Sequence, residues 1–339
     1  MRTEGETRNT SVLVTDYAWP SLDIERGILE PAGIEIVLAE RGDEDELALL
    51  ARGVDAILSC WKPISASVLD SAERCQLISK FGTGVDNIDV ERATELGILI
   101  CNVPDFCIDE VSDHAMALLL AAARRIVPFD AEVRQGVWQP RRGQALQRVR
   151  GRTLGVVGYG SIARALIPKA RVFGLEVIVF SPRIQSGPIE TGVVATNSLH
   201  EMLDVADFVS IHAPATAETR RMFDAAAFAA MKEGAWLINT SRGALVDEDA
   251  LIEALQSGRL GGAALDVLAQ EPPDPANPLL QMANVVLTPH AAFASQQAIE
   301  DLQRRAAEAV VQVMNGELPQ NIVNPEVVAS SALRFRRVL

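Results

Sequence analysis

The stretch from Leu154 to Arg183 constrains the fold of this chain more than any other segment. It reads LGVVGYGSIARALIPKARVFGLEVIVFSPR: an apolar run, a glycine-rich turn, a helical pattern and a second apolar run. Gly158 would permit a tight turn, and Gly160 would let the backbone approach a pyrophosphate that faces the N–H groups at the helix start. The small Ala163 at the third glycine position would let the helix pack closely on the strand. The segment therefore predicts a strand–helix–strand unit that binds a dinucleotide.

The end of the second apolar run bears on which dinucleotide binds. In NAD-binding units, an Asp or Glu about 20 residues beyond the turn accepts hydrogen bonds from the adenosine ribose. Here the strand ends in Ser181, Pro182 and Arg183, so no carboxylate stands there to repel a 2′-phosphate. Arg183 is either a planar donor to such a phosphate or a solvated loop arginine. We expect NADP(H) or NAD(H), with NADP slightly preferred.

Length and charge limit the classes of protein to which the chain can belong. Its 339 residues suffice for two domains, and 48% hydrophobic with 22% charged residues describe a globular protein. A net charge of −14 argues against nucleic acid or an anionic membrane as partner. No apolar run approaches the roughly 18 residues of a membrane span, and no signal peptide is expected before Ser11. We therefore expect a cytoplasmic protein.

The four cysteines lack the paired spacing of a metal site. They stand in or beside apolar runs, and we expect reduced thiols in or near the core and no metal. These residues are Cys60, Cys75, Cys101 and Cys107.

From Ser11 onward, short apolar runs alternate with helical patterns. This alternation predicts parallel sheets wrapped by helices, so the expected fold class is α/β. The segment Met1–Thr10 is polar without periodicity, and we expect it to be frayed. Helices are predicted near 23–30, 44–51, 65–72, 90–96, 161–173, 198–205, 224–231, 247–257 and 295–316.

A further helix is predicted over 110–125, apolar on nearly all faces and therefore buried between layers or domains. His114 lies within it and is expected to be a satisfied core or interface histidine rather than a ligand. The segment Ile126–Arg150 that follows is rich in Arg and Gln, and we expect a connector. Its Trp138 would be an exposed aromatic anchor that packs against a second subunit, which suggests a homodimer.

A loop with two glycines in three residues, Gly82-Thr83-Gly84, follows the predicted strand at 75–80. Ligands bind at the carboxyl ends of strands in open α/β sheets, and such a loop can form an anion-binding concavity for a carboxylate. An ordinary tight turn is the alternative. Lys80 could add a cation there, although a lysine at a strand end is more often solvated.

Three residues of complementary chemistry each follow a predicted strand of the second domain: Arg242, Glu271 and His290. Hydride transfer to a carbonyl needs a proton donor on the oxygen, and His serves this purpose near neutral pH. A carboxylate on the imidazole would keep it protonated and oriented, and an arginine would clamp the substrate carboxylate. The set suits reduction of a 2-keto acid.

Five motifs in the same order make the resemblance to a known family specific: GVVGYGSIAR, HAPATAETR, INTSRGALVDEDAL, GAALDVLAQEPP and NVVLTPHAAFAS. From about Ser11 to Pro325, the chain resembles the D-isomer-specific 2-hydroxyacid dehydrogenases. The resemblance implies two doubly wound parallel-sheet domains. A Rossmann cofactor domain, 107–293, would be inserted in a flavodoxin-like substrate domain made of 1–106 and 294–339.

The resemblance also assigns roles to individual residues. Arg242 would bind substrate, Glu271 would orient His290, and His290 would be the acid/base. The substrate loop would comprise Gly82, Thr83 and Gly84. With Arg183 included, the expected cofactor-binding residues are Gly158, Gly160, Ser161, Ile162, Ser181, Arg183, His212, Pro214, Thr240, Ser241 and Asp266.

The sequence departs from the family pattern at two places. Ser181 replaces the ribose-binding acid. The motif HAAF resembles the branch that includes the C-terminal-binding-protein corepressors, but Phe293 is followed by the small Ala294. The leading expectation is an oxidoreductase that transfers a hydride between a nicotinamide cofactor and a small D-2-hydroxy or 2-keto acid, such as glyoxylate or hydroxypyruvate. The alternatives are a 3-phosphoglycerate dehydrogenase and a non-catalytic, dinucleotide-sensing corepressor-like protein.

Overall fold

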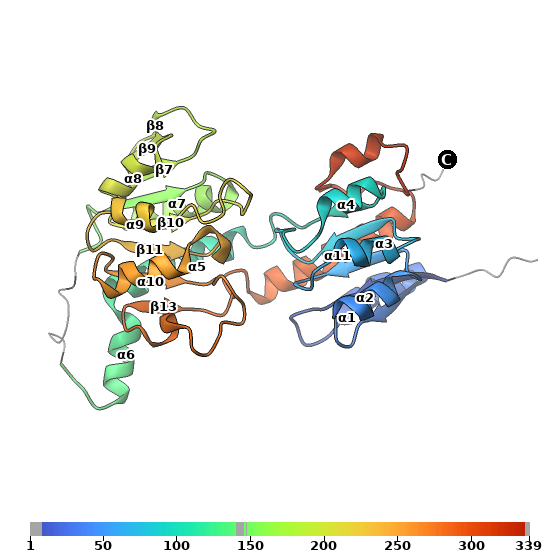
Figure 1. Ribbon diagram of the computed structural model, residues 1–339, viewed down its shortest axis with the longest axis horizontal. Helices are drawn as coiled ribbons and strands as arrows, with labels where there is room; N and C mark the ends of the chain where they lie inside the picture. Colours follow the sequence, from blue (N-terminus) through green and yellow to red (C-terminus); the bar gives the residue numbers. More distant parts are fainter. Residues whose placement is uncertain (1–8, 140–145, 147, 336–339) are drawn as a thin grey trace, which may run out of the picture. The chain divides into compact units, whose positions relative to one another are not determined.

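The computed structural model describes residues 9–139, 146 and 148–335. The chain forms two compact units, which are distinct in Figure 1. Unit 1 comprises Met1–Phe106 and Ser295–Leu339, and unit 2 comprises Cys107–Ala294. Apart from Asn9 and Thr10, the amino-terminal segment that we expected to be frayed lies outside the described residues.

Unit 1 contains a parallel sheet with the strand order β2-β1-β3-β4-β5. This is the flavodoxin-like order expected from the resemblance. Every residue of β3, β4 and β5 is buried, because helices cover both faces and the strands can be continuous apolar runs. The strands are β1 (Thr10–Val14), β2 (Ile34–Leu38), β3 (Ala56–Ser59), β4 (Leu77–Lys80) and β5 (Leu99–Cys101).

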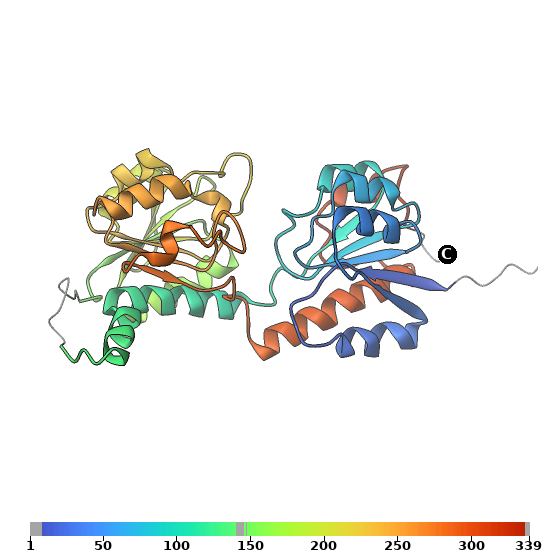
Figure 2. The ribbon, with the colours of Figure 1, turned by 60° about the horizontal axis from the view of Figure 1, so that its bottom comes forward.

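The two faces of this sheet bury alternate residues of the same strands. Val12 and Val14 pack with α1 and α11, whereas Leu13 packs with α2, α3 and α4 on the other face. Figure 2 shows α11 lying along α1 beneath the sheet. The helices are α1 (Asp23–Leu29), α2 (Glu44–Ala51), α3 (Ala66–Ser71), α4 (Val90–Glu95) and α11 (Gln296–Met314), with short 3₁₀ turns η1 (Glu30–Ala32) and η4 (Pro325–Ala329).

Unit 2 contains a larger sheet with the order β13-β12-β11-β10-β6-β7-β9-β8. All neighbours are parallel except β8 and β9. The order reverses beside β6, as in a Rossmann fold, and ligands bind at such a switch point. The strands are β6 (Thr153–Val157), β7 (Glu176–Phe180), β8 (Gly187–Glu190), β9 (Val193–Thr196), β10 (Phe208–Ile211), β11 (Trp236–Asn239), β12 (Gly262–Leu265) and β13 (Val285–Leu287).

Helices cover both faces of this sheet as well. Helices α5 and α7 pack on one face of the sheet, and helices α8, α9 and α10 pack on the other. The helices are α5 (Ile108–Arg124), α6 (Ile126–Arg134), α7 (Ser161–Val172), α8 (Leu199–Val205), α9 (Ala225–Ala230) and α10 (Glu248–Gln256), with 3₁₀ turns η2 (Gly243–Leu245) and η3 (Pro278–Gln281). The predicted α/β class with two doubly wound sheets is confirmed.

Two local predictions were wrong. The expected connector 126–150 begins with a helix, α6, which has no buried residue and therefore left no apolar periodicity to read. Residues 140–145 and 147 of this connector lie outside the described residues. The strands β8 and β9 were not predicted, because β8 contains Gly187 and Pro188 and lies at the sheet edge, where a strand needs little apolar sequence.

The cysteines are buried and form no disulfide. Burial raises the pKa of the Cys60, Cys75 and Cys107 thiols to about 12 and that of Cys101 to about 11. The prediction of core thiols is confirmed. Across the described residues, no helix combines the length and apolar character that a membrane crossing requires.

Candidate active site

The glycine turn between β6 and α7 has the geometry of an anion-binding turn. Gly158 has φ +96°, and a Cβ atom added there would lie 2.6 Å from the His212 carbonyl oxygen, so only glycine fits. No atom lies within 4 Å of a Cβ built on Gly160, which leaves open space in front of the turn. No described side chain caps the first N–H groups of α7, which begins with Ser161 and Ile162. These N–H groups and the positive end of the helix dipole suit a phosphate.

Two buried polar atoms beside this turn have no hydrogen-bond partner within the described part of the chain: Thr240 Oγ1 and His212 Nδ1. Burial lowers the pKa of His212 to about 4, so its ring is neutral at pH 7, and its Nε2 lies 2.8 Å from Ser210 Oγ. Buried polar groups rarely stay unsatisfied. His212 follows β10, which pairs with β6, and Thr240 follows β11, the next strand, so both residues lie at the carboxyl edge where a dinucleotide would bind.

Other expected cofactor residues contact the protein itself. Ser241 Oγ donates to the Ile211 carbonyl at 2.7 Å, and the carbonyl of the exposed Pro214 accepts from Thr219 Oγ1 at 2.6 Å. At the end of β7, Ser181 is buried, and its Oγ accepts from the Arg183 N–H at 3.4 Å. The Arg183 side chain is exposed and makes no ion pair with a described residue.

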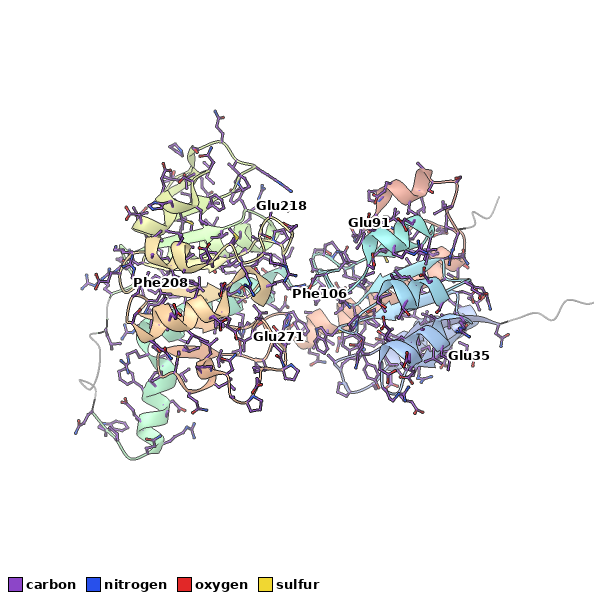
Figure 3. All side chains as sticks on the ribbon, in the orientation of Figure 1. Glu35, Glu91, Phe106, Phe208, Glu218 and Glu271 are labelled. Carbon is purple, nitrogen blue, oxygen red and sulfur yellow. The ribbon has the colours of Figure 1, made fainter. Side chains whose placement is uncertain are left out.

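His290 and Glu271 form a dyad. His290 Nδ1 lies 2.6 Å from Glu271 Oε2, and Glu271 Oε1 accepts from the Leu268 N–H at 3.0 Å. Glu271 lies on the loop that follows β12 (Figure 3). Burial acts to raise the pKa of Glu271, but the hydrogen bond and charge of His290, the Leu268 N–H and the Arg242 charge lower it on balance. The carboxyl is thus ionised at neutral pH and can accept a hydrogen bond from the Nδ1–H of His290.

Arg242 stands on a turn that a buried asparagine builds. Asn239 Nδ2 donates to the Arg242 carbonyl at 2.9 Å, and Asn239 Oδ1 accepts from the Ser241 N–H at 3.0 Å. A Cβ at the following residue, Gly243, would lie 2.0 Å from the Leu268 carbonyl oxygen. This close approach brings the Arg242 turn to the loop that carries Glu271, and the structure therefore groups the three predicted catalytic residues beyond β11, β12 and β13.

The loop that carries His290 is held by Asp266. His290 has φ +51°, a conformation that costs a non-glycine residue about 1–3 kcal/mol and persists only where surrounding contacts impose it. The Asp266 carboxylate accepts from the N–H groups of Ala291 and Ala292, each at 2.9 Å, and its carbonyl accepts from the His290 N–H at 2.8 Å. Asp266 is only 2% exposed. In this chain it organises the turn that carries His290, which its position in the sequence did not reveal.

The Gly82-Thr83-Gly84 loop belongs to unit 1. Its Gly82 carbonyl accepts from the Val103 N–H at 3.0 Å, and its Thr83 carbonyl accepts from Asn102 Nδ2 at 2.7 Å. The N–H groups of Thr83 and Gly84 donate to no described residue, as a carboxylate cradle requires. Lys80 is not solvated: it is 5% exposed, and its Nζ donates to the Cys60 carbonyl and to Asn87 Oδ1.

Sequence reasoning missed Asn239 and the organising contacts of Asp266. A buried asparagine at a strand end, between apolar residues and a glycine turn, was the available signal for the first. Among the described residues, no group of three or more His, Cys, Asp or Glu could hold a metal ion.

Comparison with known proteins agrees with this geometry. The model of the D-isomer specific 2-hydroxyacid dehydrogenase, NAD binding domain, matches residues 116–292. The chain is 42% identical over 279 residues to a glyoxylate reductase of Korarchaeum cryptofilum, covering 81% of this chain and 84% of that one. The chain belongs to the D-isomer-specific 2-hydroxyacid dehydrogenase family. The family and the oxidoreductase class predicted from the sequence are confirmed.

Other members of the family differ in length. A D-3-phosphoglycerate dehydrogenase of Methanocaldococcus jannaschii is 37% identical over 315 residues, which are 92% of this chain but only 59% of that protein. An NADPH-dependent glyoxylate/hydroxypyruvate reductase of Sinorhizobium meliloti, solved with NADP and malonate, superposes with a TM-score of 0.84 at 30% identity. That superposition covers 98% of this dehydrogenase-family chain and 99% of the other.

We expect Glu271→Gln to shift the pH profile of this family member. Keto-acid reduction requires the protonated His290, and the Glu271 carboxylate stabilises that positive charge. A neutral amide removes the stabilisation, so the basic limb of the kcat profile should move to lower pH. The measurement is kcat between pH 5 and 9, with Glu233→Gln, an exposed glutamate of the same unit, as control. Superimposable profiles for wild type and Glu271→Gln would show that Glu271 has only a structural role.

Proposed function

We propose that this protein is an NAD(P)-dependent reductase of small 2-keto acids, acting in the other direction as a D-2-hydroxyacid dehydrogenase. Unit 2 would bind the cofactor and unit 1 the substrate. The observation that carries the proposal is the 2.6 Å bond between His290 Nδ1 and Glu271 Oε2 beside Arg242. Together these residues supply a proton donor, its orienting carboxylate and a cation for the substrate.

Each of these residues would have a separate role in the reduction of a keto acid. The turn at Gly158 and Gly160 with the start of α7 would hold a nicotinamide dinucleotide, which would supply a hydride for the carbonyl carbon of the keto acid. His290 Nε2 gives its proton to the carbonyl oxygen, which becomes the hydroxyl of the product. Glu271 holds the opposite ring nitrogen and stabilises the imidazolium before transfer. Arg242 would pair with the substrate carboxylate and polarise the carbonyl. In unit 1, the N–H groups of the 82–84 loop suit a carboxylate.

The cations near the substrate loop favour an acid without a phosphate. Lys80 donates to a carbonyl and to Asn87, and Lys62 Nζ donates to the Arg41 carbonyl at 2.9 Å. Neither lysine points to a second anion site, which 3-phosphoglycerate would need. Glyoxylate and hydroxypyruvate, which the names of the K. cryptofilum and S. meliloti relatives contain, suit the proposal better.

The test is the loss of NADPH or NADH absorbance with glyoxylate, hydroxypyruvate or pyruvate, and its gain with 3-phosphoglycerate and the oxidised cofactor. Turnover of an unphosphorylated keto acid supports the proposal. Turnover of 3-phosphoglycerate alone would favour the serine-synthesis enzyme. Dinucleotide binding without any turnover would overturn the proposal in favour of a dinucleotide sensor.

We expect NADPH to be preferred, with NADH still usable. Ser181 neither attracts the ribose nor repels a 2′-phosphate, and the exposed Arg183 can supply a charge-assisted hydrogen bond. Such a bond contributes on the order of 1.5–3 kcal/mol, or roughly tenfold to a hundredfold in affinity. The measurement is the NADPH/NADH ratio of kcat/KM. Arg183→Ala should erase the preference and Ser181→Asp should reverse it; ratios equal to wild type in both would show that neither residue reads the 2′ position.

We also expect a homodimer built on unit 2. Helix α6 has no buried residue, yet Ile126 is 57%, Val127 48% and Val133 47% exposed, and the nearby Trp138 is 82% exposed. Covering this apolar surface would stabilise an association of two copies. Light scattering at low protein concentration should give twice the chain mass of 36.5 kDa. Only a 36.5 kDa species in the wild type would refute the dimer.

A cytoplasmic location completes the proposal, with no nucleic acid and no membrane as partner. The net charge of −14 and the four buried thiols without disulfides support it, since thiols stay reduced in the cytosol.

A further inference from the structure

We infer that His114 and Thr288 are positioning residues for the catalytic turn, acting on His290 through Asp266. The inference rests on the proposed function of His290 and extends it to a helix distant in sequence. His114 Nε2 lies 2.9 Å from Thr288 Oγ1, across 174 residues of chain. Thr288 Oγ1 in turn donates to Asp266 Oδ1 at 2.5 Å.

The direction of these hydrogen bonds follows from counting protons. A hydroxyl has one proton, and a carboxylate can only accept. Asp266 already accepts from the N–H groups of Ala291 and Ala292, so it is a carboxylate that also takes the Thr288 proton. The Thr288 oxygen is then an acceptor toward His114, whose Nε2 must carry a proton and donate.

This chain of donors fixes the Asp266 carboxylate in one orientation. Oδ1 accepts from both Thr288 Oγ1 and the Ala291 N–H, and Oδ2 accepts from the Ala292 N–H. Removing the Thr288 donor leaves the Ala291 N–H as the hydrogen-bond donor to Oδ1, because His114 Nε2 lies 3.6 Å from Oδ1, beyond hydrogen-bond distance. In a nearly dry site an acceptor with too few donors is costly. Rotation of the carboxylate would then release the two N–H groups that hold His290 at φ +51°.

The same strand end also holds the other half of the dyad. Leu268, two residues beyond Asp266, donates its N–H to Glu271 Oε1. The segment 266–268 therefore fixes the positions of both His290 and Glu271. His114 on α5 holds the buried end of this segment through Thr288. Because α5 packs on β11 and β12, the anchor is part of the rigid core and not of the loop.

The experiment compares Thr288→Val with Thr288→Ser. Valine keeps the volume but removes the hydroxyl, whereas serine keeps the hydroxyl. We expect Thr288→Val to lower kcat roughly tenfold to a hundredfold, the scale of a displaced catalytic group. Thr288→Ser should restore kcat. Because Thr288 links the two partners, the double variant His114→Phe/Thr288→Val should be no slower than the slower single variant.

Two further measurements separate positioning from general destabilisation. Ser112→Ala removes another buried hydroxyl, on α5 but bonded to Lys169, and should leave kcat at the wild-type value. In the cofactor-free protein, the His290 ring resonances, identified with His290→Gln among only four histidines, should shift in Thr288→Val and not in Thr288→Ser. Unchanged resonances and kcat in folded Thr288→Val would overturn the inference. If the wild type turns over no keto acid, the proposed function fails, while the resonance shift still tests the positioning.

Discussion

Arg242→Ala should lose at least about 10²-fold in kcat/KM for the keto acid while dinucleotide binding survives. Arg242 follows β11 on a turn that Asn239 and Gly243 build, close enough to Glu271 that its charge lowers the pKa of that carboxyl. A cation at this point stabilises the developing negative charge on the substrate, and removing one such donor has this scale of effect on the rate. The measurement is steady-state kinetics together with the NADPH dissociation constant.

Arg171→Ala is the matched control for this variant. Arg171 lies in the last turn of α7, at the end of the helix opposite the glycine turn, so its loss should leave kcat/KM unchanged. Arg242→Lys is informative as well, because lysine keeps the charge but not the planar pair of donors, and it should recover only part of the activity. A kcat/KM of Arg242→Ala near the wild-type value would refute the assignment of Arg242 as the residue that binds the substrate carboxylate.

His290→Gln should lower kcat by roughly 10²–10⁴-fold, the usual contribution of a general acid–base group. The ring is poised by Glu271 on Nδ1 and by the Asp266 contacts on its backbone, and Nε2 makes no hydrogen bond with a described residue. Glutamine fills a similar space and can bond to Glu271, but it cannot deliver a proton. Single-turnover rates of keto-acid reduction measure the loss directly.

His200→Gln is the control. His200 is an exposed residue of α8, so this substitution should leave kcat at the wild-type value. The substrate KM of His290→Gln should change much less than kcat, because the proton is transferred only in the transition state. An increase in KM with kcat at the wild-type value would instead assign His290 to substrate binding.

The sequence by itself determined the class of fold and the chemistry of the site. Strand and helix alternate with the periods that parallel sheets and covering helices need, and the spacing of the glycines in the 154–183 unit predicts the cofactor turn. Arg242, Glu271 and His290 could be grouped in advance because each follows a strand, and the carboxyl ends of parallel strands share one edge. Helix α6 and the edge strand β8 were not predicted because neither contains a buried residue, and β9, although mostly buried, is only four residues long.

Only the tertiary structure decided how the residues at that edge are held. The 2.6 Å bond between His290 and Glu271, the 2.0 Å approach that demands Gly243, and the left-handed turn at His290 depend on the paths of loops. The same is true of Asp266, which the motif assigned to the cofactor and which also binds the catalytic turn. Periodicity reports only which face of an element is buried. A hydrogen bond such as that between His114 and Thr288, 174 positions apart, depends on how the packed elements bring loop ends together, and that is set by the fold as a whole.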